Sequence, residues 1–263
     1  LPVVPAPRAC DLRQVRQLTQ RHGIPIIHDA TRVAENAYLI KVREPGHQDR
    51  TIGQIVREIC DLTDGCTMSA KKDGLVNIGG FLAVNDEELY RRAQNMVVIY
   101  EGLHTYGGMA GRDMEAVARG LVESLDFDHQ RARVGQVHYL GEKLLGWDIP
   151  VVEPIGTHGV FLDAARFYPH LDQDLFPAQA LAAALYEESG VRAMERGNVS
   201  AGRDPQTGQN RRPRLELVRH RQSERGATQH AVRPARMDVG DARDHVLRSN
   251  VRRRVDPIRG APL

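Results

Sequence analysis

The chain has 263 residues, of which 41% are hydrophobic, so it can form one large domain or two smaller ones. Its 36 basic and 34 acidic residues leave a net charge of +2, which gives no general electrostatic reason to expect nucleic acid or an anionic membrane as a partner. Its three cysteines form neither a CxxC pair nor a metal-ligand spacing. We therefore expect reduced thiols and a cytoplasmic protein.

No apolar run approaches the roughly 20 residues that a membrane span needs, and the first residues lack the basic flank of a signal peptide. The sequence does not begin with Met. We therefore expect a fragment or a processed product.

Helices and strands alternate in the first part of the predicted structure. We expect a helix that is capped by Asp11 and ended by Gly23, followed by an apolar strand at 24–27. Thr51 and Gln54 form a capping box that predicts the start of a second helix.

We expect Gly65 to close this second helix, and strands to follow at 66–68 and 81–84. Alternation with short connections favours a mostly parallel sheet covered by helices, in which ligand groups gather at the carboxyl ends of strands. Asp29 and Lys72 both lie at such ends.

The second part of the predicted structure begins with a long helical region over 112–145. Strands at 151–152 and 160–162 follow, and Pro177 suits the first turn of a further helix. The last predicted strands cover 191–195 and 215–219. A second, smaller α/β domain is therefore expected.

After Arg219 the composition changes: the tail has no Lys and no aromatic residue, and Arg recurs. We expect residues 220–263, and those before Asp11, to be an out-of-frame reading or a flexible segment rather than part of a domain. A basic arm that binds nucleic acid is the alternative, although no aromatic side chains interleave its charges.

Lys72 is the strongest candidate for chemistry, because Ser69 places a hydroxyl three residues before it. A lysine that bonds an aldehyde must lose its proton, and burial beside a second cation such as Lys71 lowers the pKa of the amine. Two adjacent lysines can also be plain surface charges. Asp29 can hold a pyridine nitrogen protonated or simply cap a helix, and Arg32 can orient a ring oxygen or lie on a helix surface.

Several motifs resemble the β-eliminating lyases, the pyridoxal-phosphate enzymes that cleave aromatic amino acids. The resemblance runs from Asp11 to Arg219. It is carried by the segments HDATR (28–32) with ENAY (35–38), GCTMSAKKD (65–73) with VNIGGF (76–81), YEG (100–102) with YGG (106–108), and FPAQ (176–179).

The resemblance implies an α/β type I fold of the pyridoxal-phosphate-dependent transferases. Residues 1–126 would be the second part of the large cofactor-binding domain, and residues 127–219 the small C-terminal domain with its connecting helix. It also implies a homotetramer with active sites at subunit interfaces. The family's phosphate-cradling loop, stacking aromatic residue and acid tyrosine would lie upstream of this chain, and its pocket-closing phenylalanine pair has no counterpart here.

The resemblance further assigns roles to individual residues. Lys72 would carry the cofactor and remove the substrate α-proton, Ser69 would bind the phosphate, Asp29 would hold the pyridinium and Arg32 the ring oxygen. Arg219 would bind the substrate carboxylate, for which a guanidinium offers two parallel hydrogen bonds. Asn77 would offer its backbone to a potassium ion, although it also suits an ordinary turn.

Four further residues would line the substrate side of the pocket, and core packing is the alternative for each: Leu103, Tyr106, His158 and Met194. We place Tyr106 among the catalytic residues. The segment MERG (194–197) resembles the tyrosine-cleaving branch, in which the residue at the position of Arg196 meets the phenol hydroxyl. The tryptophan-cleaving branch has an apolar residue there.

The expected reaction is therefore cleavage of L-tyrosine to phenol, pyruvate and ammonia. A tryptophan-cleaving enzyme and an inactive fragment remain the alternatives.

Overall fold

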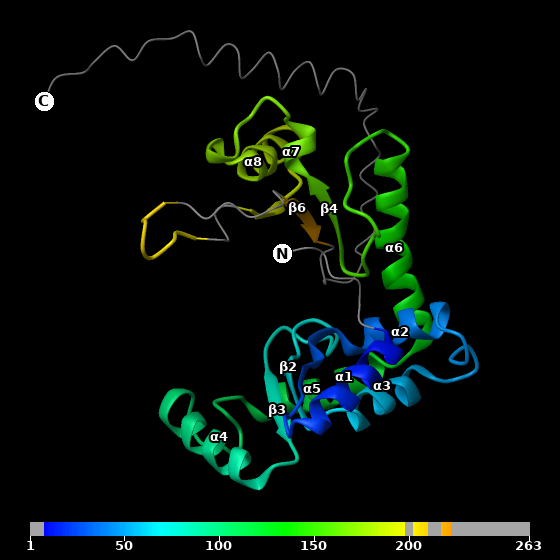
Figure 1. Cartoon of the computed structure of the whole chain (residues 1–263), viewed down its shortest axis with the longest axis vertical. Helices are drawn as coiled ribbons and strands as arrows, with labels where there is room; N and C mark the ends of the chain where they lie inside the picture. The colour runs from blue at the N-terminus through cyan, green and yellow to red at the C-terminus, as the bar shows by residue number, and fades with distance from the viewer. Residues whose placement is uncertain (1–7, 198–201, 210–216, 222–263) are drawn as a thin grey trace, which may run out of the picture. The chain divides into compact units, whose positions relative to one another are not determined.

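The computed structural model describes residues 8–197, 202–209 and 217–221 (Figure 1). These residues form two compact units, and each is described by itself. We call residues 8–139 with 154–158 the N-terminal unit, and the described residues of 140–153 and 159–221 the C-terminal unit. The Arg-rich tail from residue 222 on lies outside the described residues, and so does most of the expected out-of-frame segment. His220 and Arg221 lie in a strand, β6 (Leu217–Arg221), and Ala9 and Cys10 begin a helix, so the expectation that residues before Asp11 and after Arg219 stand outside a domain is wrong at these positions.

The N-terminal unit combines a small sheet with several helices (Figure 1). Its elements in chain order are α1 (Ala9–Arg21), β1 (Ile27–Asp29), η1 (Ala30–Arg32), α2 (Val33–Arg43), α3 (Ile52–Asp61), β2 (Gly65–Ser69), β3 (Gly80–Val84), α4 (Glu87–Tyr100), α5 (Gly111–Glu123) and α6 (Phe127–Leu145), whose last turns belong to the C-terminal unit.

The sheet of this unit has the order β1-β2-β3. Strand β1 pairs with β2 in parallel, with Asp29 opposite Thr67, whereas β3 pairs with β2 antiparallel. The described sheet is thus mixed and not mostly parallel as predicted. The candidate site lies at the ends of the parallel pair, β1 and β2. Parallel pairing brings the carboxyl ends of β1 and β2 to the same edge.

The core of the N-terminal unit lies between α1, α2, α3 and β2. Its buried residues include Ile52, Ile55 and Ile59 on one face of α3, together with Met68 of β2. The predicted capping box is confirmed: Thr51 Oγ1 accepts from the Gln54 amide at 3.1 Å, and Gln54 Oε1 accepts from the Thr51 amide at 2.9 Å. The helix therefore begins where the sequence indicates and turns its isoleucines toward the core.

Two boundary predictions in this unit are wrong. Asp11 is not the cap of α1; the helix begins at Ala9, and the Asp11 carboxylate reaches back to the amide of Arg8 at 3.4 Å. Gly65 does not close α3, which ends at Asp61, but begins β2. A Cβ at Gly65 would lie 2.6 Å from the Ala83 carbonyl oxygen, so the glycine serves the close approach of β3.

Two further differences concern β1 and the long helical region. Strand β1 covers Ile27–Asp29 and not residues 24–27, because the Ile26 amide donates to Asp64 Oδ2 at 2.8 Å instead of pairing with a strand. The region 112–145 is divided between α5 and α6. The break is held by Gln130 Nε2, which donates to the Ser124 carbonyl at 2.8 Å.

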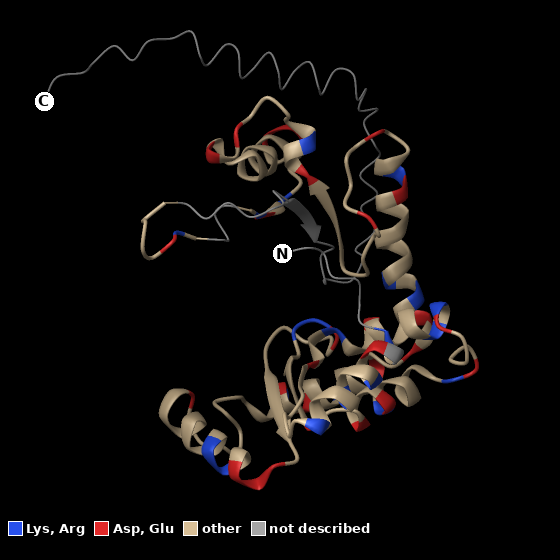
Figure 2. Cartoon of the chain, viewed as in Figure 1, with Lys and Arg blue, Asp and Glu red and all other residues tan. Residues whose placement is uncertain are grey.

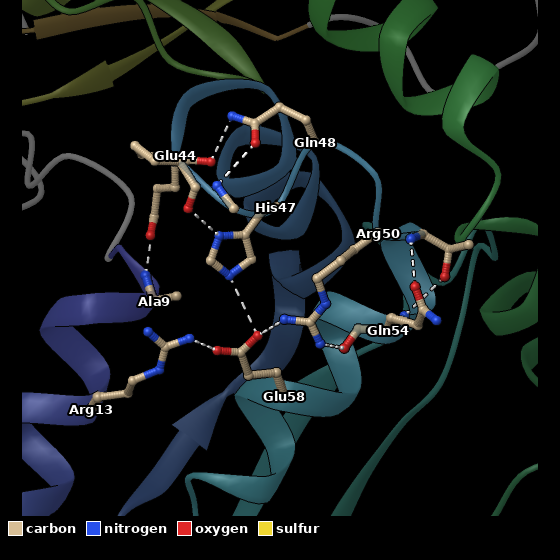
Figure 3. A network of polar contacts seen from close by, with 11 residues as sticks. Ala9, Arg13, Glu44, His47, Gln48, Arg50, Gln54 and Glu58 are labelled. Carbon is tan, nitrogen blue, oxygen red and sulfur yellow. Dashed lines mark hydrogen bonds and ion pairs between the residues drawn. The ribbon is translucent and has the colours of Figure 1, made fainter.

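A polar network joins α1, α3 and the loop between α2 and α3 (Figure 3). Its centre is the Glu58 carboxylate on α3, which is paired with Arg13 and Arg50 and lies 3.4 Å from His47 Nε2. We call these four residues the Glu58 network. Beside it, Glu44 Oε1 accepts from the Ala9 amide at 2.9 Å. The network therefore fixes the first helix to the rest of the unit.

The C-terminal unit has an antiparallel sheet of order β4-β6-β5. Its elements are β4 (Gly159–Asp163), α7 (Ala164–Phe167), η2 (Gln173–Leu175), α8 (Pro177–Ser189), β5 (Ala193–Arg196) and β6 (Leu217–Arg221). Pro177 is at the start of α8 as predicted, and Val151 forms only an isolated bridge with Leu162. Buried Val160, Ala178 and Leu181 contribute to its core.

Charged residues of both signs are interspersed along the helices of the N-terminal unit (Figure 2). No helix in the described part of the chain combines the length and the apolar character that a membrane span needs.

Candidate functional site

Lys72 lies in a turn that directly follows β2, and this turn defines one side of the candidate site. Its Nζ donates to the hydroxyl oxygen of Ser69, the last residue of β2, at 2.8 Å. The Lys72 side chain is half-buried, whereas that of Lys71 is exposed. Of the two adjacent lysines, Lys72 is therefore the one that the fold directs to the hydroxyl at the strand end.

Asp29 ends β1 at the same edge of the sheet. Its Oδ1 accepts from the Thr31 amide at 3.1 Å and thereby caps η1. Hydrogen bonds from Thr31 hold the pKa of this exposed carboxyl below its ordinary value; burial opposes them, and the positive charge of Lys72 adds a smaller lowering. Asp29 is thus an ionised carboxylate within electrostatic reach of Lys72.

Thr31 joins the two strand ends. Its hydroxyl oxygen accepts from the Ser69 amide at 3.1 Å, and its carbonyl accepts from the Asp73 amide at 3.4 Å. Asp29, Ser69 and Lys72 are therefore brought to one edge of the sheet, as the strand pattern predicted.

Arg32 is the last residue of η1, and its guanidinium is not a free surface charge. Its Nη1 lies 2.8 Å from Oε1 of Glu35, one turn later in α2. The Arg32 side chain is 22% exposed and that of Glu35 only 1%. The fold thus buries the carboxylate and leaves part of the guanidinium accessible.

Glu35 has three further partners from distant parts of the chain. Arg133 Nη2 on α6 lies 2.8 Å from Oε1, the Thr157 hydroxyl donates to Oε2 at 2.7 Å, and His158 Nδ1 lies 3.6 Å from Oε2. A buried carboxylate is tolerated only where such partners replace water.

Asp73 follows Lys72 and is completely buried. Its Oδ2 accepts from the amides of Ala34 and Glu35 at 2.8 and 3.0 Å, and its Oδ1 lies 3.5 Å from Arg133 Nη1. Burial, followed by the negative charge of Glu35, raises the pKa of Asp73 to about 7, although the hydrogen bond from the Glu35 amide and the positive charges of Arg133 and Arg32 oppose the shift. Asp73 therefore caps the first turn of α2 from the turn that carries Lys72.

We call Arg32, Glu35, Asp73, Arg133 and Thr157 the Glu35 cluster. Sequence reasoning found Arg32 but gave no role to the other four. The spacing of Arg32 and Glu35, three residues apart on one helix face, was the available signal. Nothing in the sequence indicates Arg133 or Thr157, because they are far from Glu35 along the chain.

Three of the predicted residues lie elsewhere in the N-terminal unit. Leu103 and Tyr106 are exposed in the turns that follow α4, where the Tyr106 amide donates to the Leu103 carbonyl at 3.2 Å. Asn77 is exposed in the bend before β3. His158, in contrast, lies at the Glu35 carboxylate, so its described contact is with a buried polar group.

The remaining predicted residues share the sheet of the C-terminal unit. Met194 and Arg196 lie two residues apart on β5, and both side chains are exposed. Side chains at this spacing project from the same face of a strand. Arg219 on β6 lies opposite Met194 in the β5–β6 register and opposite Phe161 of β4.

The edge of the N-terminal sheet therefore offers an amine, a hydroxyl, an ionised carboxylate and a guanidinium. An aldehyde, a phosphate, a protonated ring nitrogen and a ring oxygen are the groups that these four would bind, so the donor set fits pyridoxal phosphate. Within the described ranges, we find no group of three or more His, Cys, Asp or Glu side chains arranged to bind a metal ion.

The family model of the β-eliminating lyases matches residues 7–237 of the chain. This range is wider than the motif resemblance over 11–219. It includes both units and every candidate residue.

Curated relatives match over about 209 residues. The chain is 65% identical to a tyrosine phenol-lyase of Nostoc punctiforme, with 80% of this chain and 45% of the relative covered. It is 60% identical to a tyrosine phenol-lyase of Fusobacterium nucleatum and 61% identical to one of a Symbiobacterium strain, with coverage of 45% and 46% of those proteins. The chain thus spans somewhat less than half the length of these relatives.

Solved structures are more distant. A putative aromatic amino acid β-eliminating lyase/threonine aldolase from an Exiguobacterium has a TM-score of 0.45 at 20% identity, with 66% of this chain and 46% of that chain covered. A putative L-allo-threonine aldolase from Listeria monocytogenes has a TM-score of 0.48 at 16% identity, with 94% and 54% covered.

Proposed function

The chain belongs to the β-eliminating lyase family, and we propose that the complete protein cleaves L-tyrosine to phenol, pyruvate and ammonia with pyridoxal phosphate as cofactor. The observation that carries this proposal is the 65% identity to a tyrosine phenol-lyase across both units. The family has the type I fold of pyridoxal-phosphate enzymes, and the chain is a member of this class of lyases. Because it spans less than half of its relatives, the activity is assigned to the complete protein.

On the cofactor side, four residues of the N-terminal unit would act together. Pyridoxal phosphate, when bound, withdraws electrons from the α-carbon of an amino acid. Lys72 Nζ would bond its aldehyde carbon and later take the substrate α-proton, and the Ser69 hydroxyl would donate to a phosphate oxygen. Asp29 would keep the ring nitrogen protonated, for which its lowered pKa is suited because the carboxylate stays ionised. The exposed part of the Arg32 guanidinium would face the ring oxygen.

We propose that the residues that bind the substrate include the exposed Arg196 of β5 and Arg219 of β6. Arg196 would stabilise the phenol oxygen as negative charge develops on it, and Arg219 would bind the carboxylate. Tyr106 is proposed as a catalytic residue, and Leu103, His158 and Met194 as lining residues. The exposure of Tyr106, Leu103, Met194 and Arg196 supports these assignments, since a side chain buried in a core could not meet substrate.

Further features of the complete protein follow from the family resemblance. We propose that the backbone of Asn77 contributes to a potassium site and that the protein is a cytoplasmic homotetramer. We also propose that residues 1–126 belong to the cofactor domain and that residues 127–219 form the small domain with its connecting helix.

The identity of the leaving group is tested at Arg196. The complete protein with Arg196→Val should lose about 100- to 1,000-fold in phenol release, the effect of removing one transition-state donor. It should keep elimination from amino acids whose β-substituent leaves without help, because these need no cation at the leaving atom. Phenol, indole and pyruvate are measured in parallel.

Arg192→Val is the matched control, since Arg192 is also exposed and precedes β5. It should leave both activities unchanged. Equal losses on both substrate classes would show that Arg196 is structural. Release of indole without phenol by the unaltered protein would make it a tryptophan-cleaving enzyme.

A further inference from the structure

The Glu35 cluster has more organisation than a buried ion pair needs. One carboxylate that is 1% exposed receives two guanidinium groups and a hydroxyl, at 2.8, 2.8 and 2.7 Å. Charge-assisted hydrogen bonds of this length fix geometry as well as contribute energy. Of these partners, only Arg32 has an expected role in the cofactor site.

Arg133 connects the two carboxylates of the cluster. Its Nη2 contacts Glu35, and its Nη1 lies 3.5 Å from Asp73 Oδ1. Asp73 in turn accepts from two amides at the start of α2, one of them the amide of Glu35 itself. The turn that carries Lys72 and the helix start that carries Arg32 are thus held together through Arg133 and through the backbone.

The electrostatics of the cluster favour a fixed arrangement. Two arginines face two carboxyl groups, so positive side chains stand beside each acidic group in the buried cluster. Asp73 also places a carboxyl at the positive end of the α2 helix dipole. Moving Glu35 would leave Arg133 beside Asp73 alone and would remove the carboxylate that orients Arg32.

We propose that Glu35 is a positioning residue, which acts through Arg32 and ties its guanidinium to the turn that carries Lys72. Glu35 does not touch the cofactor; it holds the cation that would meet the ring oxygen. Thr157 and Arg133 hold Glu35 in turn. Because this inference rests on the proposed function for the role of Arg32, its test has one arm that needs no cofactor.

The cofactor-free arm measures amide hydrogen exchange in the 263-residue chain. Glu35→Gln keeps the shape of the side chain but removes its charge. Exchange in segments 30–35 and 69–75, which contain the amides of Ser69 and Asp73 that bond Thr31, should become about tenfold faster relative to amides in α3.

Glu58→Gln is the matched control, because Glu58 also receives two arginines and a histidine, but from α1 and the α2–α3 loop. It should change exchange in those two segments by no more than about twofold. Thr157→Val removes only the hydroxyl donor and should produce a smaller increase in the same segments. This milder variant decides the question if Glu35→Gln does not fold.

The second arm measures the affinity of the unaltered chain and its variants for pyridoxal phosphate. The readout is the visible absorbance that develops when the aldehyde attaches to lysine. Arg32→Ala and Glu35→Gln should each weaken binding about tenfold, and the double variant should be no weaker than Arg32→Ala alone. The pH midpoint of the absorbance change in Glu35→Gln should move to that of Arg32→Ala. Glu58→Gln should keep the original affinity and midpoint.

Two results would overturn the inference. One is equal exchange in 30–35 and 69–75 for Glu35→Gln and Glu58→Gln. The other is additive loss of affinity in the double variant, which would show that Glu35 does not act through Arg32. If the unaltered chain does not attach pyridoxal phosphate, the cofactor assignment fails for this chain, and the exchange arm alone decides whether Glu35 positions the turn.

Discussion

The Glu35 cluster and the Glu58 network use the same groups in two different places of one unit. In each, a glutamate receives two arginines and faces a histidine. Glu35 is 1% exposed and lies beside the ends of β1 and β2, whereas Glu58 is 14% exposed and joins α1 to α3 (Figure 3). Only the Glu35 cluster contains a residue of the candidate site, Arg32.

The comparison shows how burial changes the effect of similar ion pairs on the pKa of a carboxyl group. Burial would raise the pKa of Glu58, but hydrogen bonds from Arg13 and Arg50 outweigh it, and the pKa lies below its ordinary value. In the buried cluster the balance is reversed at Asp73, whose pKa rises. The outer network thus stabilises the ionised form of Glu58, whereas burial and the nearby Glu35 carboxylate disfavour the ionised form of Asp73 beside the lysine turn.

The largest difference is expected when each glutamate is truncated. Glu35→Ala should lower the free energy of unfolding by about 3–5 kcal/mol, because it leaves Arg133 and Arg32 without their shared buried partner. Glu58→Ala should cost about 1 kcal/mol, since water can replace the carboxylate there. Urea unfolding of the two variants measures both values. Similar costs would show that burial does not separate the two networks.

A smaller contrast is expected for two helical glycines. Gly120 of α5 packs on the turn after Lys72, and a Cβ there would lie 1.8 Å from the Gly74 carbonyl oxygen. Gly120→Ala should therefore cost about 1–3 kcal/mol.

Gly53 of α3, the helix that carries Glu58, offers the control. A Cβ there would meet Leu125 Cδ1 at 3.5 Å, an ordinary contact. Gly53→Ala should be neutral or stabilising by up to about 0.5–1 kcal/mol. Thermal unfolding compares the two variants, and a neutral Gly120→Ala would contradict the close packing of α5 on the lysine turn.

The last contrast concerns pH, where the stabilities of the two regions should respond in opposite directions. The pKa of Asp73 is raised from 3.8 to about 7, so its contribution to stability is complete below about pH 4 and is lost as the pH rises toward 7. The pKa of Glu58 is lowered from 4.5, so its contribution is present above that value and is lost as the pH falls below it.

Unfolding free energies measured from pH 3 to 8 separate the two contributions. Asp73→Asn should flatten the decline between about pH 4 and 7, and Glu58→Gln should flatten the decline at the acid end. An unchanged profile in Asp73→Asn would place the titrating group elsewhere.

Local signals in the sequence predicted local structure well. The capping box of Thr51 and Gln54 marks the start of α3, because both partners lie within one turn. The order of β1 and β2 likewise placed Asp29 and Lys72 at one edge. Boundaries failed where a distant group decided them, as at Ile26, whose amide is taken by Asp64.

The Glu35 cluster could not have been predicted in the same way. Thr157 donates to Glu35 across 122 positions of the chain, and Arg133 reaches it from α6. Hydrophobic periodicity carries no information on such polar contacts. The signal that was available, an Arg and a Glu three residues apart, is common on exposed helices and does not indicate burial.

The central claim is that Lys72 carries the cofactor at the edge shared by β1 and β2. Borohydride reduction of the complete protein with pyridoxal phosphate, followed by peptide mapping, tests it directly. The label should be found on Lys72, which is half-buried and bonded to Ser69, and it should be absent in Lys72→Ala but retained in Lys71→Ala. A label on Lys71, or one that persists in Lys72→Ala, would contradict the account.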